Sequence, residues 1–238
     1  MSSMTTARSG LLTIFVAAVD LAALASLGLL YTPELLRDPL SLTLLLALAG
    51  TVGARSVRLT ESGLRVVAAD AFIFCALLAF APAAAPLVAL ASMLGVAAGK
   101  DGKLLSVKAA FNTGAVPLSM AAGTAVFLQL GGSTGGTPGA VLPLFAAAAT
   151  FGIVNVLLTT TAVHLGTGRN WLELLRQSFG VAIVSGITHA LLGAGLMWVF
   201  AATGPLGLAL GLVPVIPMEQ YARGLAGRFD RLGGRIGA

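Results

Sequence analysis

The stretch LLTIFVAAVDLAALASLGLLY, residues 11–31, decides the fold. It is apolar along its length except for a few small polar residues and one ionisable residue, Asp20. A helix needs about 20 such residues to cross the hydrocarbon core of a bilayer. Arg8 followed by this run resembles a signal peptide. The run is long enough for a full span, however, and no soluble mature domain follows it, so we predict an uncleaved first transmembrane helix.

The rest of the chain has the same character. Of its 238 residues, 57% are hydrophobic and 10% are charged, and the mean hydropathy is +0.96. A soluble domain carries roughly 25% charged residues, so this composition excludes a soluble globular protein, a disordered tail and a secreted disulfide scaffold. Cys75 is the single cysteine, which excludes an intrachain disulfide.

Apolar runs separated by short polar connections predict an all-α fold, a polytopic transmembrane helix bundle of about eight spans. Their expected bounds are 11–31, 40–54, 66–81, 83–99, 106–130, 140–165, 180–201 and 204–220. The two runs that flank Pro82 are short for a crossing, so they are either thin spans or a re-entrant hairpin shielded by protein. Residues 1–221 are expected to form one transmembrane bundle.

The basic residues predict the orientation. With the N-terminus in the cytoplasm, every lysine and arginine except Arg37 falls on the cytoplasmic side, which predicts an N-in, C-in topology. The formal net charge is +5, but the basic residues do not cluster with aromatic residues, so we expect no nucleic-acid partner. All tyrosines and tryptophans fall at expected span ends or in an interfacial segment: Tyr31, Trp171, Trp198 and Tyr221.

Two amphipathic segments are expected on the cytoplasmic side. Asn170 and Glu173 have the spacing of a helix-capping box, and the apolar stripe from Trp171 to Phe179 predicts a separate surface helix in the headgroups. Residues 222–238 form a basic amphipathic cytoplasmic tail, which either lies on an anionic leaflet or docks a partner protein.

Polar side chains within the expected spans are the candidate functional residues, because an ionisable group at membrane depth is costly. Counted at about 1.5 Å per residue, Asp20, Asn155 and His189 lie at a common depth of about 14 to 15 Å. If they converge, they form either a polar lock in which Asp20 pairs with His189, or a ligand or proton site. Asp70 and His164 are expected nearer the cytoplasmic interface, where water reaches them.

No catalytic pattern surrounds these residues. His164 and His189 lie on different expected spans, and neither belongs to a metalloprotease, paired-cysteine or nucleophile-elbow motif. We therefore expect a protein that is not an enzyme and that has no metal site and no cofactor.

Several short segments carry a family resemblance: Asp70-Ala71-Phe72, Ala81-Pro82, Pro86 to Leu90, Leu94-Gly95, Lys108 to Asn112, and Phe151 to Val156. The region from about residue 40 to residue 220 resembles the vitamin-uptake-like membrane sensor domain of bacterial signalling proteins. That domain is similar to the substrate-binding components of energy-coupling-factor transporters.

The resemblance implies a multi-pass protein of the bacterial cytoplasmic (inner) membrane. Asn112 and Asn155 are its most distinctive residues. Asp70 stands where such domains often have glutamate, and no catalytic output domain is expected after Ala238.

Two functions remain open on these grounds. The first is a membrane module that binds a small organic ligand through Asp20, Asn112, Asn155 and His189, as a detached sensor or as a transport component that needs an energising membrane partner. For that partner, the small residues Ala18 and Ala22 offer a docking surface. The second is an accessory subunit of a larger membrane complex, with lipid or pigment contacts and no solute site. A proton-coupled transporter that acts alone through Asp20 and His189 is a weaker third.

Overall fold

The computed structural model describes residues 2–55, 57–58, 65–66, 69–99, 106–134 and 138–213. The expected tail at 222–238 and the C-terminal part of the last expected span lie outside these residues. Within them the protein is helical, apart from one short antiparallel pair of strands, β1 (Val57–Arg58) and β2 (Arg65–Val66). The predicted all-α class is therefore confirmed.

Each expected span corresponds to one α-helix in the described part of the chain. The helices, with two short 3₁₀ turns, are α1 (Ser2–Leu30), η1 (Pro33–Leu36), α2 (Pro39–Ala54), α3 (Asp70–Ala79), α4 (Ala84–Ala98), α5 (Val107–Gln129), η2 (Pro138–Ala140), α6 (Val141–Thr167), α7 (Trp171–Thr203) and α8 (Pro205–Leu210).

Four of these helices are long and apolar enough to cross a membrane. They are α1 from Arg8 onward, α5, α6 and α7. In contrast, α3 has 10 residues and a length of about 15 Å, half of the roughly 30 Å hydrocarbon core. Helices α3 and α4 flank the turn at Pro82, as expected, but α3 is too short to cross a bilayer by itself.

The separate surface helix predicted after Asn170 is wrong. Residues Trp171–Thr203 form one continuous helix, α7. An interior glycine such as Gly180 costs only about 1 kcal/mol of helix stability, too little to end the helix. The predicted cap is present, because Asn170 Oδ1 accepts from the amides of Leu172 (2.9 Å) and Glu173 (3.2 Å).

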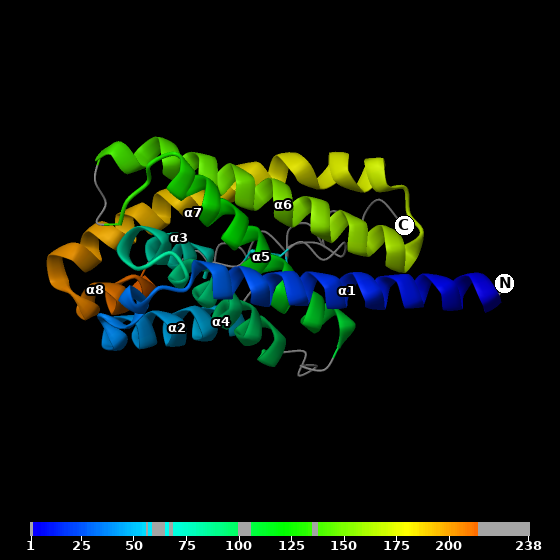
Figure 1. Cartoon of the computed structure of the whole chain (residues 1–238), viewed down its shortest axis with the longest axis horizontal. Helices are drawn as coiled ribbons and strands as arrows, with labels where there is room; N and C mark the ends of the chain where they lie inside the picture. The colour runs from blue at the N-terminus through cyan, green and yellow to red at the C-terminus, as the bar shows by residue number, and fades with distance from the viewer. Residues whose placement is uncertain are drawn as a thin grey trace, which may run out of the picture.

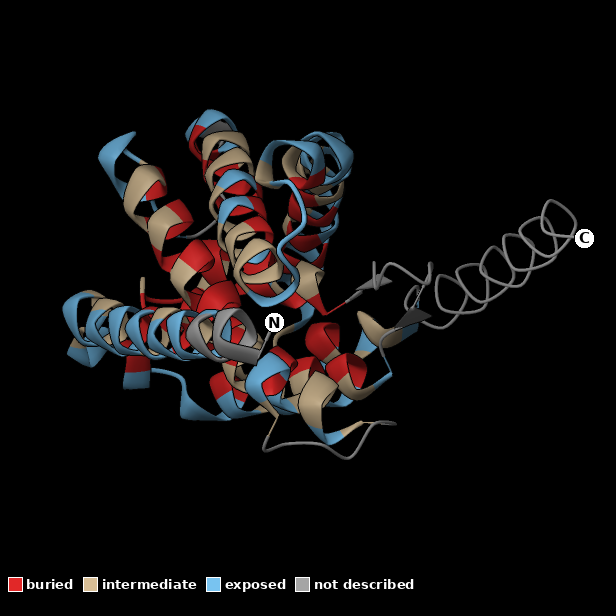
Figure 2. Cartoon of the chain, turned by 90° about the vertical axis from the view of Figure 1, so that its right-hand side faces the viewer, coloured by how far each residue is buried: buried red, intermediate tan, exposed pale blue. Residues whose placement is uncertain are grey.

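The helices lie roughly along one axis (Figure 1). Helices α6 and α7 pack together along one side of the bundle, α2 and α4 pack together on the other, and α5 contacts α1, α4 and α6. Buried residues gather on the faces that the helices turn toward one another, while exposed residues face outward (Figure 2). Side by side, the helices thus form one bundle with a common interior.

Helix α3 lies at the centre of this bundle. Its residues from Phe72 to Leu78 are all buried, with no more than 2% of each exposed. Phe74 meets Phe151 of α6 edge to face, with ring centroids 5.8 Å apart, and Phe80 stacks on Phe200 of α7 at 5.6 Å. A helix that is apolar all round is typical of a protein core or a membrane interior.

Small residues allow α2 and α4 to pack backbone against backbone. A Cβ atom added to Gly95 would overlap the Gly50 carbonyl group, and one added to Gly53 would overlap that of Ser92. Small residues at such interfaces let helices approach closely in a membrane, where hydrophobicity does not drive helices together.

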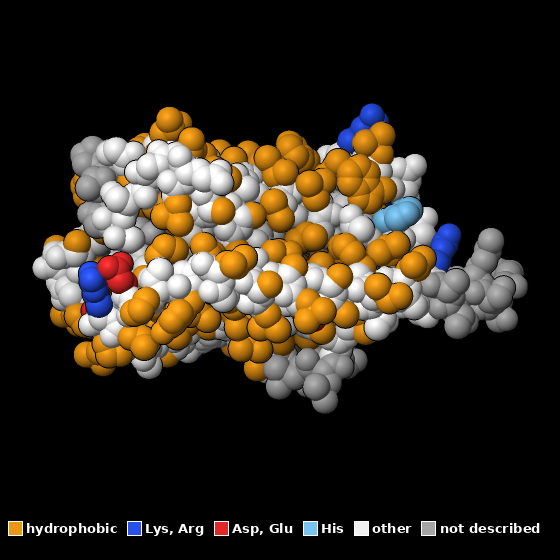
Figure 3. All heavy atoms as spheres, in the orientation of Figure 1, with side chains coloured by type: hydrophobic (Ala, Val, Ile, Leu, Met, Phe, Trp, Pro, Cys, Tyr) orange, Lys and Arg blue, Asp and Glu red, His pale blue; other side chains and the backbone are white. Residues whose placement is uncertain are grey.

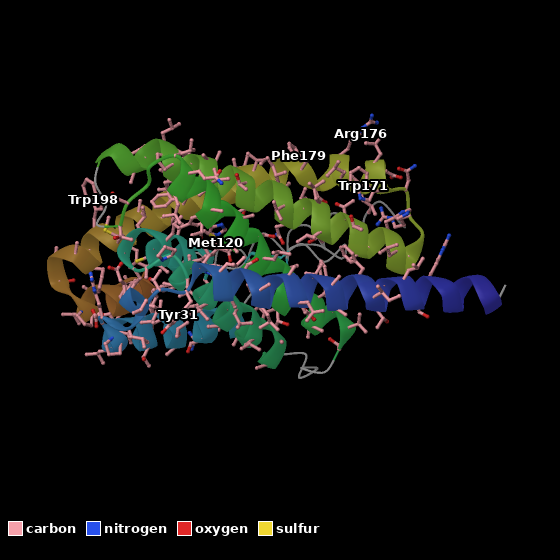
Figure 4. All side chains as sticks on the ribbon, in the orientation of Figure 1. Tyr31, Met120, Trp171, Arg176, Phe179 and Trp198 are labelled. Atoms are coloured by element: carbon pink, nitrogen blue, oxygen red, sulfur yellow. The ribbon has the colours of Figure 1, made fainter. Side chains whose placement is uncertain are left out.

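Charge and aromatic residues mark the two ends of the bundle. In Figure 3, basic side chains lie at the ends, and hydrophobic side chains cover the sides between them. Trp171 lies toward one end of the long axis, and Trp198 and Tyr31 lie toward the other (Figure 4). The 27 residues from Trp171 to Trp198 correspond to about 40 Å of helix, close to the full thickness of a bilayer with its headgroups.

We predict that Gly95→Ala lowers the thermal midpoint of the detergent-solubilised protein, because overpacking typically costs about 1–3 kcal/mol. The matched control is Gly28→Ala on α1, where an added Cβ meets nothing within 4 Å. A Gly95→Ala midpoint equal to that of the control would contradict the close packing of α2 and α4.

Asp38 gives a second prediction, because it caps α2 and lies outside the spanning segments. Its Oδ1 accepts from the Ser41 amide at 3.1 Å, and hydrogen bonding to Ser41 holds the pKa of Asp38 below its ordinary value of 3.8. A depressed folded-state pKa stabilises the protein fully above the unfolded value, and this contribution disappears as the pH falls through the folded value.

Asp38→Ala is therefore expected to lower the thermal midpoint at pH 7, and the difference from the wild type is expected to shrink when the pH falls below 3.8. Thermal unfolding at pH 7 and at acid pH checks this. A difference that stays constant or grows on acidification would show that the charged cap does not stabilise α2.

Candidate functional site

A group of polar side chains lies inside the bundle where α3 begins. The Asp70 carboxylate (Oδ2) lies 3.9 Å from Nδ1 of His189 on α7. The Ser185 hydroxyl, one turn earlier on α7, lies 3.2 Å from the same nitrogen. Only 5% of His189 is exposed. An acid, an imidazole and a hydroxyl thus meet inside the bundle.

The expectation that Asp70 lies near the cytoplasmic interface is wrong. His189 is 18 residues from the start of α7 and 14 from its end, so it lies near the middle of that helix. Asp70 lies beside it, because α3 starts inside the bundle. From there α3 runs parallel to the second half of α7, with Phe74 against Gly193 and Phe80 against Phe200.

The N-terminus of α3 adds polar backbone groups to this cluster of side chains. Ala69 precedes the helix as a turn, and it is buried. The first amides of a helix have no partner within the helix, and the helix dipole makes that end electropositive. Asp70 in the first turn places a carboxylate where this field is favourable, next to the imidazole.

The expected pair of Asp20 and His189 is not formed. Asp20 lies on α1, where its Oδ1 packs against Gly114 of α5 at a position that a side chain would fill. Helix α1 packs on α5 and α6, whereas His189 lies on α7 against α3. Oδ1 of Asp20 is buried and has no hydrogen-bond partner among the residues that the structure describes. The polar layer expected from depth alone is therefore divided between two interfaces.

The two asparagines are half-buried on neighbouring helices. Asn112 is on α5, one residue after Phe111, which stacks on Phe15 of α1 at 6.2 Å. Asn155 is on α6, one turn after Phe151. Neither asparagine forms a hydrogen bond with a residue that the structure describes. Their amides remain able to bind another polar group.

Sequence reasoning missed the pairing of Asp70 and the contribution of Ser185. Two signals were present. An acidic residue opens a run too short for a full span, which is typical of a helix that starts within a bundle. A serine four residues before a histidine on one helix lies on the same face.

The other polar features have local structural roles or lie elsewhere. His164 Nδ1 contacts the carbonyl oxygen of Arg169 at 2.6 Å, beyond Gly168, whose φ of 73° ends α6. No group of three potential metal-binding side chains occurs in the described residues. A shallow depression of about 380 Å³ lies at the start of α7, far from the expected midplane site, and is lined by Asn170, Leu172, Glu173, Arg176 and Gln177.

Comparison with known proteins adds no family assignment: no protein-family model, curated protein or solved structure matches this chain. The vitamin-uptake-like resemblance and the roles it implies therefore stay predictions.

Neutralising Asp20 and neutralising Asp70 are expected to change the thermal midpoint differently. Asp20→Asn should leave the thermal midpoint unchanged or raise it, because it removes a carboxylate whose buried oxygen has no partner within the described part of the chain. Asp70→Asn should lower the midpoint, because it removes the carboxylate from both His189 and the start of α3.

Thermal unfolding of both variants, solubilised in parallel with the wild type, measures this. Greater destabilisation by Asp20→Asn than by Asp70→Asn would instead identify Asp20 as a lock that holds the bundle together.

Proposed function

We propose that this protein is an integral membrane module that binds a small organic molecule, without catalysis, where α3 begins beside α7. The single observation that carries the proposal is the open geometry of the buried pair. Asp70 Oδ2 and His189 Nδ1 are 3.9 Å apart, longer than the 2.7–3.2 Å of a direct hydrogen bond.

This geometry favours a site over a closed structural lock. A polar lock is most stabilising when its members bond directly, because an unsatisfied polar group in a membrane interior is costly. About 17% of the Asp70 side chain remains exposed, whereas residues Phe72 to Leu78 of α3 are buried. A hydroxyl, amide or amine of a ligand would complete the hydrogen bonds that this pair leaves open.

The start of α3 after the turn at Ala69 supports the same proposal. A helix that begins inside a membrane bundle offers its free first backbone amides to a ligand, as the half-helices at transporter substrate sites do. Non-helical backbone is tolerated at this depth only where protein encloses it or where it lines a cavity.

Each polar residue has a role in this proposal. Asp70 accepts hydrogen bonds from the ligand, His189 donates or accepts according to its tautomer, and Ser185 orients the imidazole. Asn112 and Asn155 are proposed to bind further polar groups of the ligand through their amides. Asp20 is proposed as a more distant ligand-binding residue at the interface of α1 and α5.

The proposed setting is the bacterial cytoplasmic (inner) membrane, with both termini in the cytoplasm and eight membrane-embedded segments. The distribution of basic residues supports this orientation. The vitamin-uptake-like resemblance supports a sensor or a solute-binding transport component, and the latter would need an energising partner in the membrane.

An accessory role in a larger membrane complex is the second candidate, and α1 is the observation that favours it. Along α1, Leu21 and Leu24 are exposed together with the small residues Ala18 and Ala22. Such a surface suits close packing against a helix of a partner protein. In this case the pair at α3 is structural, and lipid or pigment contacts replace a solute site.

Native mass spectrometry of the protein, extracted gently from its host membrane, distinguishes these functions. We expect one small organic molecule bound to the wild type and lost from both Asp70→Asn and Ser185→Ala. The control is Glu34→Gln, which removes an exposed ion pair with Arg37 and should retain the molecule.

Circular dichroism of each variant shows whether it is folded, and Ser185→Ala keeps the test decisive if Asp70→Asn unfolds. Stoichiometric association with a large complex that retains only lipid or pigment would overturn ligand binding and favour the accessory role. A molecule retained by folded Asp70→Asn and Ser185→Ala would place the site elsewhere.

A further inference from the structure

The first turns of α7 carry an exposed basic group at headgroup depth. Trp171 is expected to lie at the membrane interface at this end, and its indole Nε1 donates to Thr161 Oγ1 of α6 at 3.2 Å. Leu174 is buried and anchors the same segment against the bundle. Arg176 follows little more than one turn after Trp171 and points away from the bundle in Figure 4.

Arg176 has no carboxylate partner among the residues that the structure describes. The nearest acid in sequence, Glu173, instead accepts a hydrogen bond from Gln177 (Nε2 to Oε1, 3.2 Å). An arginine at a membrane surface interacts favourably with anionic lipid, and its planar guanidinium matches a phosphate group.

The surface around Arg176 combines this charge with apolar contacts. Leu172, Arg176 and Phe179 follow one another at helical spacing, so they share one face, and 48% of Leu172 and 42% of Phe179 are exposed. Toward the middle of α7, Val181 and Val184 are also exposed, on other sides of the helix. The depression of about 380 Å³ beside Arg176 gives a headgroup a place to bind.

We propose that this surface is a binding site for an anionic glycerophospholipid. The lipid phosphate binds the Arg176 guanidinium, the Gln177 amide donates to the headgroup, and an acyl chain lies along the exposed Phe179. A free phosphate would satisfy only Arg176, whereas a phospholipid also covers the apolar residues below it. This proposal requires that the chain lies in a bilayer, and it is independent of the site at Asp70.

Trp171 provides an intrinsic reporter for this site. The chain has two tryptophans, so Trp198→Phe leaves Trp171 as the single fluorophore. This variant is reconstituted into phosphatidylcholine nanodiscs that contain a small fraction of lipid with brominated acyl chains, carrying either a phosphatidylglycerol or a phosphatidylcholine headgroup. Bromine quenches a tryptophan only at short range, so quenching measures which lipid occupies the site.

We expect brominated phosphatidylglycerol to associate about fivefold more strongly than brominated phosphatidylcholine. Arg176→Gln in the same background should remove this preference, and Glu173→Gln should increase it by removing a neighbouring negative charge. The matched control is Arg37→Gln at the opposite end of the bundle, where the arginine is paired with Glu34 at 2.9 Å. The control should retain the full preference.

Soluble glycerol phosphate distinguishes the source of the phosphate group. It should not displace brominated phosphatidylglycerol, because it lacks the acyl chains. Equal quenching by the two lipids in the parent variant, an unchanged preference in Arg176→Gln, or displacement by glycerol phosphate would each overturn the proposal.

Discussion

The burial of α3 is the constraint on which the rest of the structure depends. This helix is too short to cross a bilayer, so its first backbone amides and the turn before it lie inside the bundle. Such backbone groups inside a membrane bundle are stable where protein encloses them or where they line a cavity. Helices α2, α4 and α7 supply that enclosure, and the small residues Gly53, Gly95 and Gly193 let them approach closely enough.

The same constraint explains why the polar residues separate into two sets. Asp70 reaches His189 because α3 runs parallel to the second half of α7 from a starting point near its middle. Asp20 faces the surface of α5 at Gly114, on the other interface of the bundle. Residues at one depth therefore differ in environment, and an open acid–imidazole pair beside the start of a helix is the more versatile of the two for binding a ligand.

The outer surface of the bundle differs from the interior in where its charged and apolar side chains lie. Exposed apolar residues cover the sides of α1 and α7, as expected for contact with acyl chains, while charged residues lie at the ends. At the start of α7 these two surfaces meet, because Trp171 precedes the exposed Phe179 by little more than two turns and Arg176 precedes it by less than one. An amphipathic boundary of this kind binds lipids that carry both a charge and a hydrocarbon chain.

The sequence by itself determined the helical class and the position of each helix to within a few residues at most ends, because a hydrophobic run of given length has few alternatives to a membrane helix. It also predicted the cap at Asn170 from side-chain chemistry alone. Only the tertiary structure decided that α7 is continuous past Gly180, that α3 begins inside the bundle, and that His189 meets Asp70 and not Asp20. Depth along a helix follows from counting residues. The partner of a side chain depends instead on how its helix is rotated and on which helix lies beside it. The packing of the whole bundle sets the rotation and the neighbours of each helix.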